Sequence, residues 1–103
     1  MQVTRQLRLE VERREVATGT TVTFRVRDAQ GRPIEDAVVQ TETKSQRTDG
    51  RGLCQLRFDS PGFSKVLAAK APTDRVAYDP ASTLIRVVPN ESSLRPRRRI
   101  GAR

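Results

Sequence analysis

The feature that most constrains the fold of this 103-residue chain is an apolar residue at every second position. The alternation occurs in several short segments, among them QLRLEVER, TVTFRVR, LCQLRFD and TLIRVV. A period of two is typical of half-buried antiparallel strands, in which one face packs on the core and the other contacts water. No segment shows the 3.6-residue period of an amphipathic helix, so the sequence predicts an all-β fold.

Turn signals divide the chain into about seven short strands. Single glycines and prolines separate the apolar runs at the spacing expected of an all-β sandwich. The Asp-Gly pair in RTDGRG predicts a tight hairpin between residues 43–48 and 53–58. The connection at residues 71–82 is long for a hairpin, and long ordered loops are often functional. We expect a single sandwich over residues 3–89, with Tyr78 in a loop at its edge.

The C-terminal segment differs from the rest of the chain in composition and charge. From Pro89 onward the alternation stops, and an arginine run with Pro96 opposes both helix and central strand. The net charge is +8, and residues 91–103 supply +4 of it. The sequence predicts that residues 90–103 form a disordered, basic, flexible tail.

Three motifs follow one another between residues 20 and 70: TVTFRVRDAQGRPIEDAVV, RTDGRGLCQLRF and SPGFSKVLAAK. Together they resemble the immunoglobulin-like modules grouped as carboxypeptidase regulatory-like and bacterial Ig-like domains. Many of these modules have an aromatic residue where this chain has Ser64. The resemblance implies an immunoglobulin-like antiparallel β-sandwich but no particular activity, since such modules serve as spacers, adhesion units and accessory domains. The matching positions are Asp28, Gly31, Pro33, Ile34, Ala37, Thr48, Asp49, Gly52, Gly62, Val66 and Ala68.

Residues suited to catalysis are nearly absent. The chain has no histidine, the commonest general base and metal ligand, and its single cysteine, Cys54, falls on the core face of its predicted strand. The closest carboxylates, Glu35 with Asp36 and Asp74 with Asp79, are interpreted as solvated turn residues. No calcium loop or phosphate-binding glycine loop is present. We therefore expect no enzyme activity, no catalytic residue, no metal, no cofactor and no small-molecule substrate.

Arginine is the strongest positive signal in the sequence. Of the 20 basic residues 17 are arginine, which suits bidentate contacts with phosphate or carboxylate, although a genome rich in G and C produces the same bias. Outward arginines on the predicted strands, Arg25, Arg27 and Arg57, are weaker candidates for polyanion binding. The principal candidates lie in the tail and are Arg95, Arg97, Arg98, Arg99 and Arg103.

Two functions from different classes fit these observations. The first is a non-catalytic structural or protein-interaction module, whose tail attaches it to an acidic protein surface or a larger assembly. The alternative is a nucleic-acid-associated protein that binds RNA or a ribonucleoprotein particle through the tail and strand arginines. A third and weaker hypothesis is the accessory domain of an exported hydrolase. Without a signal peptide or an apolar span, we expect no membrane insertion and a cytoplasmic location, with export only for a domain excised from a longer protein.

Overall fold

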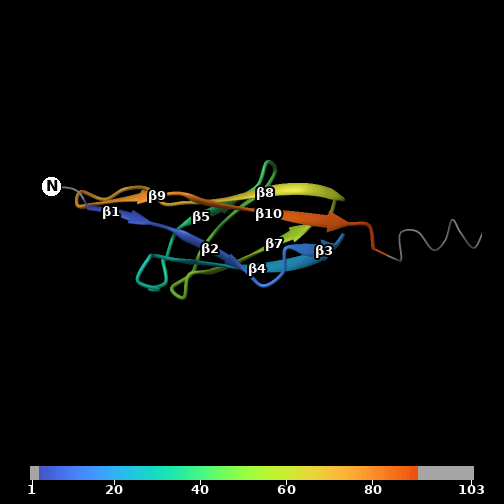
Figure 1. The fold of residues 1–103 in the computed structure, drawn as a ribbon, viewed down its shortest axis with the longest axis horizontal. Coiled ribbons are helices and arrows are strands. Elements are labelled where there is room, and N and C mark those ends of the chain that lie inside the picture. The colour runs from blue at the N-terminus through green and yellow to red at the C-terminus, as the bar shows by residue number, and fades with distance from the viewer. Residues whose placement is uncertain (1–2, 91–103) are drawn as a thin grey trace, which may run out of the picture.

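The computed structural model describes residues 3–90, which form strands and turns but no helix (Figure 1). None of these residues therefore belongs to a helix that is long and apolar enough to cross a membrane. The strands are β1 (Val3–Gln6), β2 (Arg8–Val11), β3 (Glu15–Ala17), β4 (Thr20–Arg27), β5 (Val38–Gln40), β6 (Ser45–Arg47), β7 (Leu53–Phe58), β8 (Gly62–Ala69), β9 (Val76–Asp79) and β10 (Ala81–Val88).

The strands build a sandwich of two sheets, which confirms the predicted fold class. The smaller sheet has the order β2-β4-β7 and the larger sheet the order β3-β10-β8-β5-β6. The orders β2-β4-β7 and β5-β8-β10 correspond to A-B-E and C-F-G of the immunoglobulin-like fold. A third, two-stranded sheet of β1 and β9 lies at the end of the sandwich opposite to the one where β10 ends (Figure 1).

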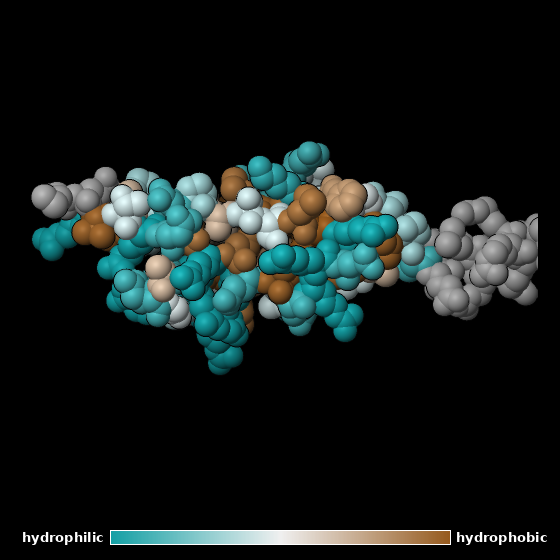
Figure 2. Space-filling model, in the orientation of Figure 1, coloured by the Kyte–Doolittle hydropathy of each residue, from teal (hydrophilic) through white to brown (hydrophobic). Residues whose placement is uncertain are grey.

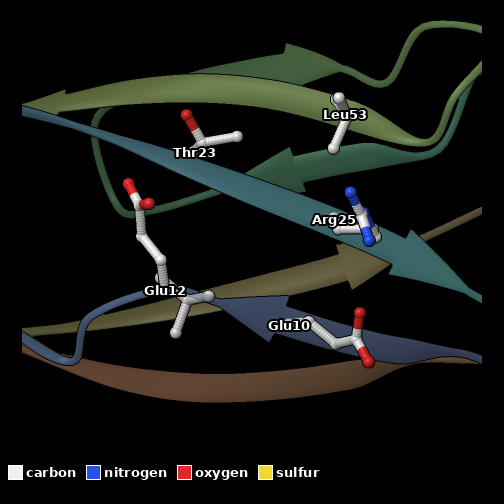
Figure 3. A pocket seen from close by; sticks show the side chains of 6 residues that line it. Glu10, Glu12, Thr23, Arg25 and Leu53 are labelled. Carbon is white, nitrogen blue, oxygen red and sulfur yellow. The ribbon is translucent and has the colours of Figure 1, made fainter.

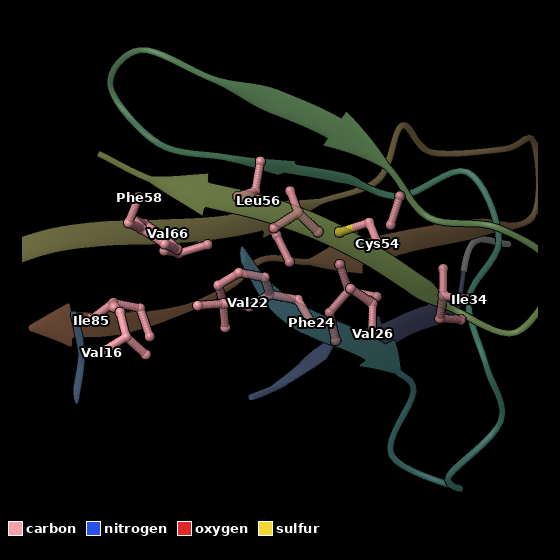
Figure 4. Close-up of a cluster of buried hydrophobic side chains, with 14 of the residues drawn as sticks. Val16, Val22, Phe24, Val26, Ile34, Cys54, Leu56, Phe58, Val66 and Ile85 are labelled. Carbon is pink, nitrogen blue, oxygen red and sulfur yellow. The ribbon is translucent and has the colours of Figure 1, made fainter. Parts of the chain in front are cut away.

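The core lies between the two sheets and follows the alternation seen in the sequence. Side chains of β4 and β7 on one side meet those of β8 and β10 on the other (Figure 4). Phe24 is fully buried, and its ring packs against that of Phe58 with 6.2 Å between the centroids. The other buried apolar residues are Leu7, Val16, Val22, Val26, Ile34, Ala37, Val39, Cys54, Leu56, Val66, Ala68, Ile85 and Val87.

The N-terminal segment divides into three strands that change partners. The chain breaks at the buried Leu7, so that β1 pairs with β9, β2 with β4, and β3 with β10. The pairings of β1 with β9 and β3 with β10 are parallel, which departs from the wholly antiparallel prediction. These extra short strands raise the count from about seven to ten.

The connection at residues 71–82 is not the irregular loop that its length predicted. Residues Val76–Asp79 form β9, because they gain backbone partners in β1, with Val3 opposite Val76. Tyr78 is therefore a strand residue, partly buried against the core, with the Lys70 Nζ atom 5.9 Å from its ring centroid.

The predicted hairpin between residues 43–48 and 53–58 is wrong. A tight turn does form there, since the Gly52 N–H donates to the Asp49 carbonyl at 2.9 Å, but β6 pairs with β5 and β7 pairs with β4. All three β6 side chains are exposed, whereas alternate side chains of β7 are buried and need the core side of the smaller sheet. The turn therefore carries the chain from one sheet to the other.

Buried Thr48 fixes the start of this crossing. Its hydroxyl accepts the Ala37 N–H at 2.9 Å and donates to the Ile34 carbonyl at 2.6 Å. Both of its hydrogen-bonding roles are thus satisfied away from water, which is the condition for burying a hydroxyl without a large cost.

Candidate interaction surfaces

The predicted strand arginines lie on the outer face of the smaller sheet. Arg25 and Arg27 belong to β4 and Arg57 to β7, and all three point away from the buried residues of their strands. Arg57 is opposite Thr21 in the register, four residues from Arg25. At about 3.3 Å per residue this places the two backbone positions roughly 13 Å apart. The structure thus brings Arg25 and Arg27 together and leaves Arg57 at the far end of the face.

Carboxylates interrupt the positive charge of this face. Arg27 forms an ion pair with Glu10 at 3.3 Å, and Arg57 forms one with Asp59 at 2.7 Å. Hydrogen bonds from Arg57 and Lys44 lower the pKa of Asp59, which keeps that carboxylate charged. Among residues 3–90 Arg25 has no ion-pair partner within 4 Å. The face is therefore a mixture of both charges rather than a continuous basic stripe.

A shallow hollow of about 280 Å³ lies between β2 and β4 on this face. Figure 3 shows Glu10 and Arg25 near each other at one end of it and Glu12 with Thr23 at the other. Glu10 and Arg25 are cross-strand partners, so charges of opposite sign stand side by side. This lining selects neither an anion nor a cation.

The outer face of the larger sheet carries a different feature, an exposed apolar group that we call the β8–β10 patch. It consists of Phe63 and Leu67 on β8 and Leu84 on β10. Phe63 is 70% exposed and Leu84 is 51% exposed. Leu84 lies diagonally across from both β8 residues, because its direct partner in the register is Lys65. In Figure 2 apolar surface of this kind shows between charged side chains over β8 and β10.

Polar and charged side chains border the β8–β10 patch. Arg86 stands opposite Phe63, and Ser82 stands opposite Leu67. Arg86 is already paired with Glu15 at 3.3 Å. Lys65 is exposed and makes no ion pair within 4 Å with any residue that the structure describes. Lys65 is thus the one cation at the centre of the patch whose charge is not balanced by a described neighbour.

The sequence interpretation did not single out this patch, although the signal was present. With Val66 and Ala68 assigned to the core, the same alternation places Leu67 on the solvent face. Ile85 and Val87 likewise place Leu84 outward. The sequence signal for this patch is therefore a large apolar residue at a position of a half-buried strand that points to solvent.

The described chain ends at one end of the larger sheet, where Asn90 contacts Thr18. The Asn90 backbone N–H donates to the Thr18 hydroxyl at 3.2 Å, and the Asn90 side-chain amide donates to the Thr18 carbonyl at 3.1 Å. Val87 is opposite Gly62, so the chain leaves the structure at the same end of the sheet as Phe63. The predicted tail arginines, Arg95, Arg97, Arg98, Arg99 and Arg103, lie outside the described residues.

Two of the side chains that sequence analysis considered for catalysis, Cys54 and Asp36, are buried or ion-paired. Cys54 is 8% exposed, and its burial, together with the charge of Asp49, raises its pKa to about 11. Asp36 pairs with Arg47 at 2.9 Å, and this hydrogen bond lowers its pKa. Within residues 3–90 no three His, Cys, Asp or Glu side chains are grouped as ligands of a metal ion.

Comparison with known proteins adds no relative. Neither a protein family model, nor a curated protein, nor a solved structure matches this chain. The immunoglobulin-like sandwich therefore rests on the strand order, and the resemblance to carboxypeptidase regulatory-like modules stays a prediction.

Proposed function

We propose that this protein is a non-catalytic interaction module whose sandwich binds another protein through the β8–β10 patch. The observation that carries the proposal is the exposure of Phe63 and Leu84 on one sheet face. Exposed apolar groups rimmed by polar residues mark protein-binding surfaces, because water contact with them is relieved when a partner covers them. Aromatic residues such as Phe63 are enriched at the centres of such interfaces.

The rest of the chain supports a binding role. The patch lies on long strands of the larger sheet, β8 and β10, which are held by core residues on their opposite face. A rigid platform needs little ordering when it binds, which lowers the entropic cost of association. The five arginines after Asn90 give the module a second, electrostatic means of attachment to a negatively charged partner.

Substitutions in the patch test this proposal without disturbing the core. We expect the double variant Phe63→Ser/Leu84→Ser to fold with unchanged stability and to lose at least tenfold in affinity for the purified partner. The partner is to be found by comparing what wild type and variant retain from ribonuclease-treated extract of the source cells. Val3→Ser is the matched control, because Val3 is 54% exposed but belongs to β1. Equal retention by wild type, double variant and control would contradict the proposal.

The alternative, binding of RNA or a ribonucleoprotein, is favoured by one observation. Arg8 and Arg27 are direct cross-strand partners and Arg25 lies on the same outer face. Of the carboxylates on this face only Glu10 forms an ion pair with the group, and Glu12 lies at the far end of the hollow beside Thr23, so three cations lie close to one another with a single paired anion. Such a group can contact phosphates, and its binding would weaken steeply with salt. The interrupted charge and the absence of exposed aromatic side chains on this face of the described sheet make it the second candidate.

A further inference from the structure

The geometry points to a partner whose binding surface has an apolar centre and carries a carboxylate directly opposite Lys65. This inference rests on the proposed function and adds to it the chemistry of the partner. It follows from the place of Lys65 within the β8–β10 patch and from the charges around it.

Lys65 lies inside the patch rather than at its edge. Along β8 it stands between Phe63 and Leu67 on the outer face, and across the strands it is opposite Leu84. All three apolar members of the patch are therefore its neighbours on β8 and β10, while β5, with Gln40 opposite Leu67, lies on the other side of β8. A partner that covers Phe63 and Leu84 must also cover the ammonium group. Because burying an unpaired charge is expensive, the partner has to supply a carboxylate at that position.

No carboxylate of the described residues lies within 4 Å of the Lys65 ammonium group, and this includes the exposed Glu42, which follows β5 by two residues. Glu15 is the acidic residue of β3 on the same sheet face, and it is paired with Arg86. Asp36 is paired with Arg47, and Asp59 is shared by Lys44 and Arg57. The charge of Lys65 is thus available to a partner.

The same charges argue against two other occupants of the patch. A second copy of this chain would bring another Lys65 and a net charge of +8 to the interface, so self-association through this face is opposed by repulsion. Duplex nucleic acid offers phosphates to Lys65 but a highly charged backbone to Phe63 and Leu84, which leaves the apolar residues uncovered. A single strand can stack a base on Phe63, but it offers no apolar contact to Leu67 and Leu84. An acidic protein surface with apolar residues at its centre satisfies both parts of the patch.

The test uses the full chain with a photoreactive phenylalanine analogue, p-benzoylphenylalanine, in place of Phe63 in the source cells. The control places the same analogue at Thr21, which is exposed on the smaller sheet. Each protein is also made with Lys65→Glu, and with Arg25→Glu as a matched reversal of another cation that lacks an ion pair within residues 3–90. The adduct is identified, and its crosslinked segment is sequenced.

We expect one protein adduct from position 63 and none of the same size from position 21. Its crosslinked segment should hold apolar residues next to Asp or Glu. Lys65→Glu should reduce the yield at least tenfold, Arg25→Glu should change it less than twofold, and a Lys or Arg in place of the partner's carboxylate should restore binding to Lys65→Glu.

A patch-dependent protein adduct that is insensitive to Lys65→Glu would overturn this inference while the proposed function stands. No protein adduct, or an adduct to nucleic acid, would overturn both. An adduct to a second copy of this chain would overturn the acidic partner and replace it with a dimer.

Discussion

At the scale of the residue, a few polar side chains determine where the strands begin and end. Asp28 is almost fully buried directly after β4, where one carboxylate oxygen accepts the N–H groups of Gln30 and Arg32 at 2.9 and 3.0 Å. Its other oxygen accepts the Arg32 side-chain N–H at 3.1 Å and lies 3.6 Å from Arg5 of β1. A single carboxylate thus closes the turn and joins it to the N-terminal strand.

The pKa of Asp28 makes this turn sensitive to acid. Burial alone raises the pKa, but the backbone N–H groups of Arg32 and Gln30 and the charge of Arg32 together outweigh burial and hold it below its usual range. Because the folded pKa lies below the unfolded value of about 3.9, the stabilisation is complete above about pH 4. It is lost as the pH falls through the folded pKa.

We expect Asp28→Asn to lower the free energy of unfolding by about 2 kcal/mol at pH 7, since charged hydrogen bonds become neutral ones. The difference from wild type should shrink below pH 4, where the wild-type carboxylate also becomes neutral. Urea unfolding at several pH values measures both effects. Asp74→Asn is the control, because Asp74 is exposed. A difference that stays constant down to pH 2 would show that the charge of Asp28 does not stabilise the turn.

Gly52 occupies a position that no other residue can take without movement of the backbone. Its φ is +77°, and a Cβ atom would stand 2.5 Å from the Val26 carbonyl oxygen. Gly31 has a similar φ of +85° with nothing within 4 Å of the added atom. We expect Gly31→Ala to cost about 1 kcal/mol from the backbone conformation alone, and Gly52→Ala about 3 kcal/mol or more. Thermal unfolding of the two variants compares them directly, and equal losses would mean that the close approach to β4 does not matter.

At the scale of the element, the sequence determines faces better than it determines partners. The inward positions Val22, Phe24 and Val26 were predicted correctly because alternation within a strand is local and does not depend on which strand lies beside it. The hairpin after β6 and the loop containing Tyr78 were not, because β6 pairs with the preceding β5, whereas β7 and β9 pair with strands far away in the chain. Turn residues specify a reversal of direction but not the sheet that the chain then joins.

For the candidate surfaces too, the sequence predicts which side chains point outward but not which side chains become neighbours. The outward direction of Arg25, Arg27 and Arg57 follows from alternation, whereas the carboxylates that neutralise two of them come from residues whose positions depend on register and turns. Glu10 reaches Arg27 only through the pairing of β2 with β4. The β8–β10 patch requires β8 and β10 to be neighbours, and sequence periodicity carries no such information.

The same substitution, leucine to alanine, should have very different effects on stability at the buried Leu7 and at the exposed Leu84. Leu7 is 1% exposed where β1 passes into β2, and its N–H donates to the Asp79 carbonyl at 3.0 Å. Leu7→Ala should cost about 2 to 5 kcal/mol of the free energy of unfolding, through lost burial and the cavity left behind. Leu84→Ala should stay within about 0.5 kcal/mol of wild type. Urea denaturation tests both, and a large loss in Leu84→Ala would show that the patch is packed rather than available.

At the scale of the whole molecule, charge and apolar surface are distributed over different parts of the chain. The outer face of the smaller sheet exposes mixed charges, and the outer face of the larger sheet exposes the β8–β10 patch. The largest excess of positive charge follows the point where the described chain leaves the larger sheet beside Thr18. The proposed partner therefore has two chemically different features to bind, the apolar surface of the sandwich and the positive charge of the sequence after Asn90, and two linked contacts bind more tightly than either alone.

Removal of the terminal arginines distinguishes the two proposed functions. A chain ending at Leu94 lacks five arginines, which lowers the net charge from +8 to +3. Because the buried cluster within the described chain ends at Val87, the free energy of unfolding should change by less than about 0.5 kcal/mol.

We expect both forms to bind mixed-sequence RNA and duplex DNA weakly, with binding lost near physiological salt, since four or five phosphate contacts on duplex DNA give a salt slope of only about −4. Sub-micromolar binding of the full chain at that salt, abolished by the truncation, would replace the protein-interaction proposal with a nucleic-acid one. A truncation that keeps patch-dependent binding to the protein partner but weakens it tenfold or more at low salt would show that the tail adds electrostatic attachment to a surface that the sandwich already recognises.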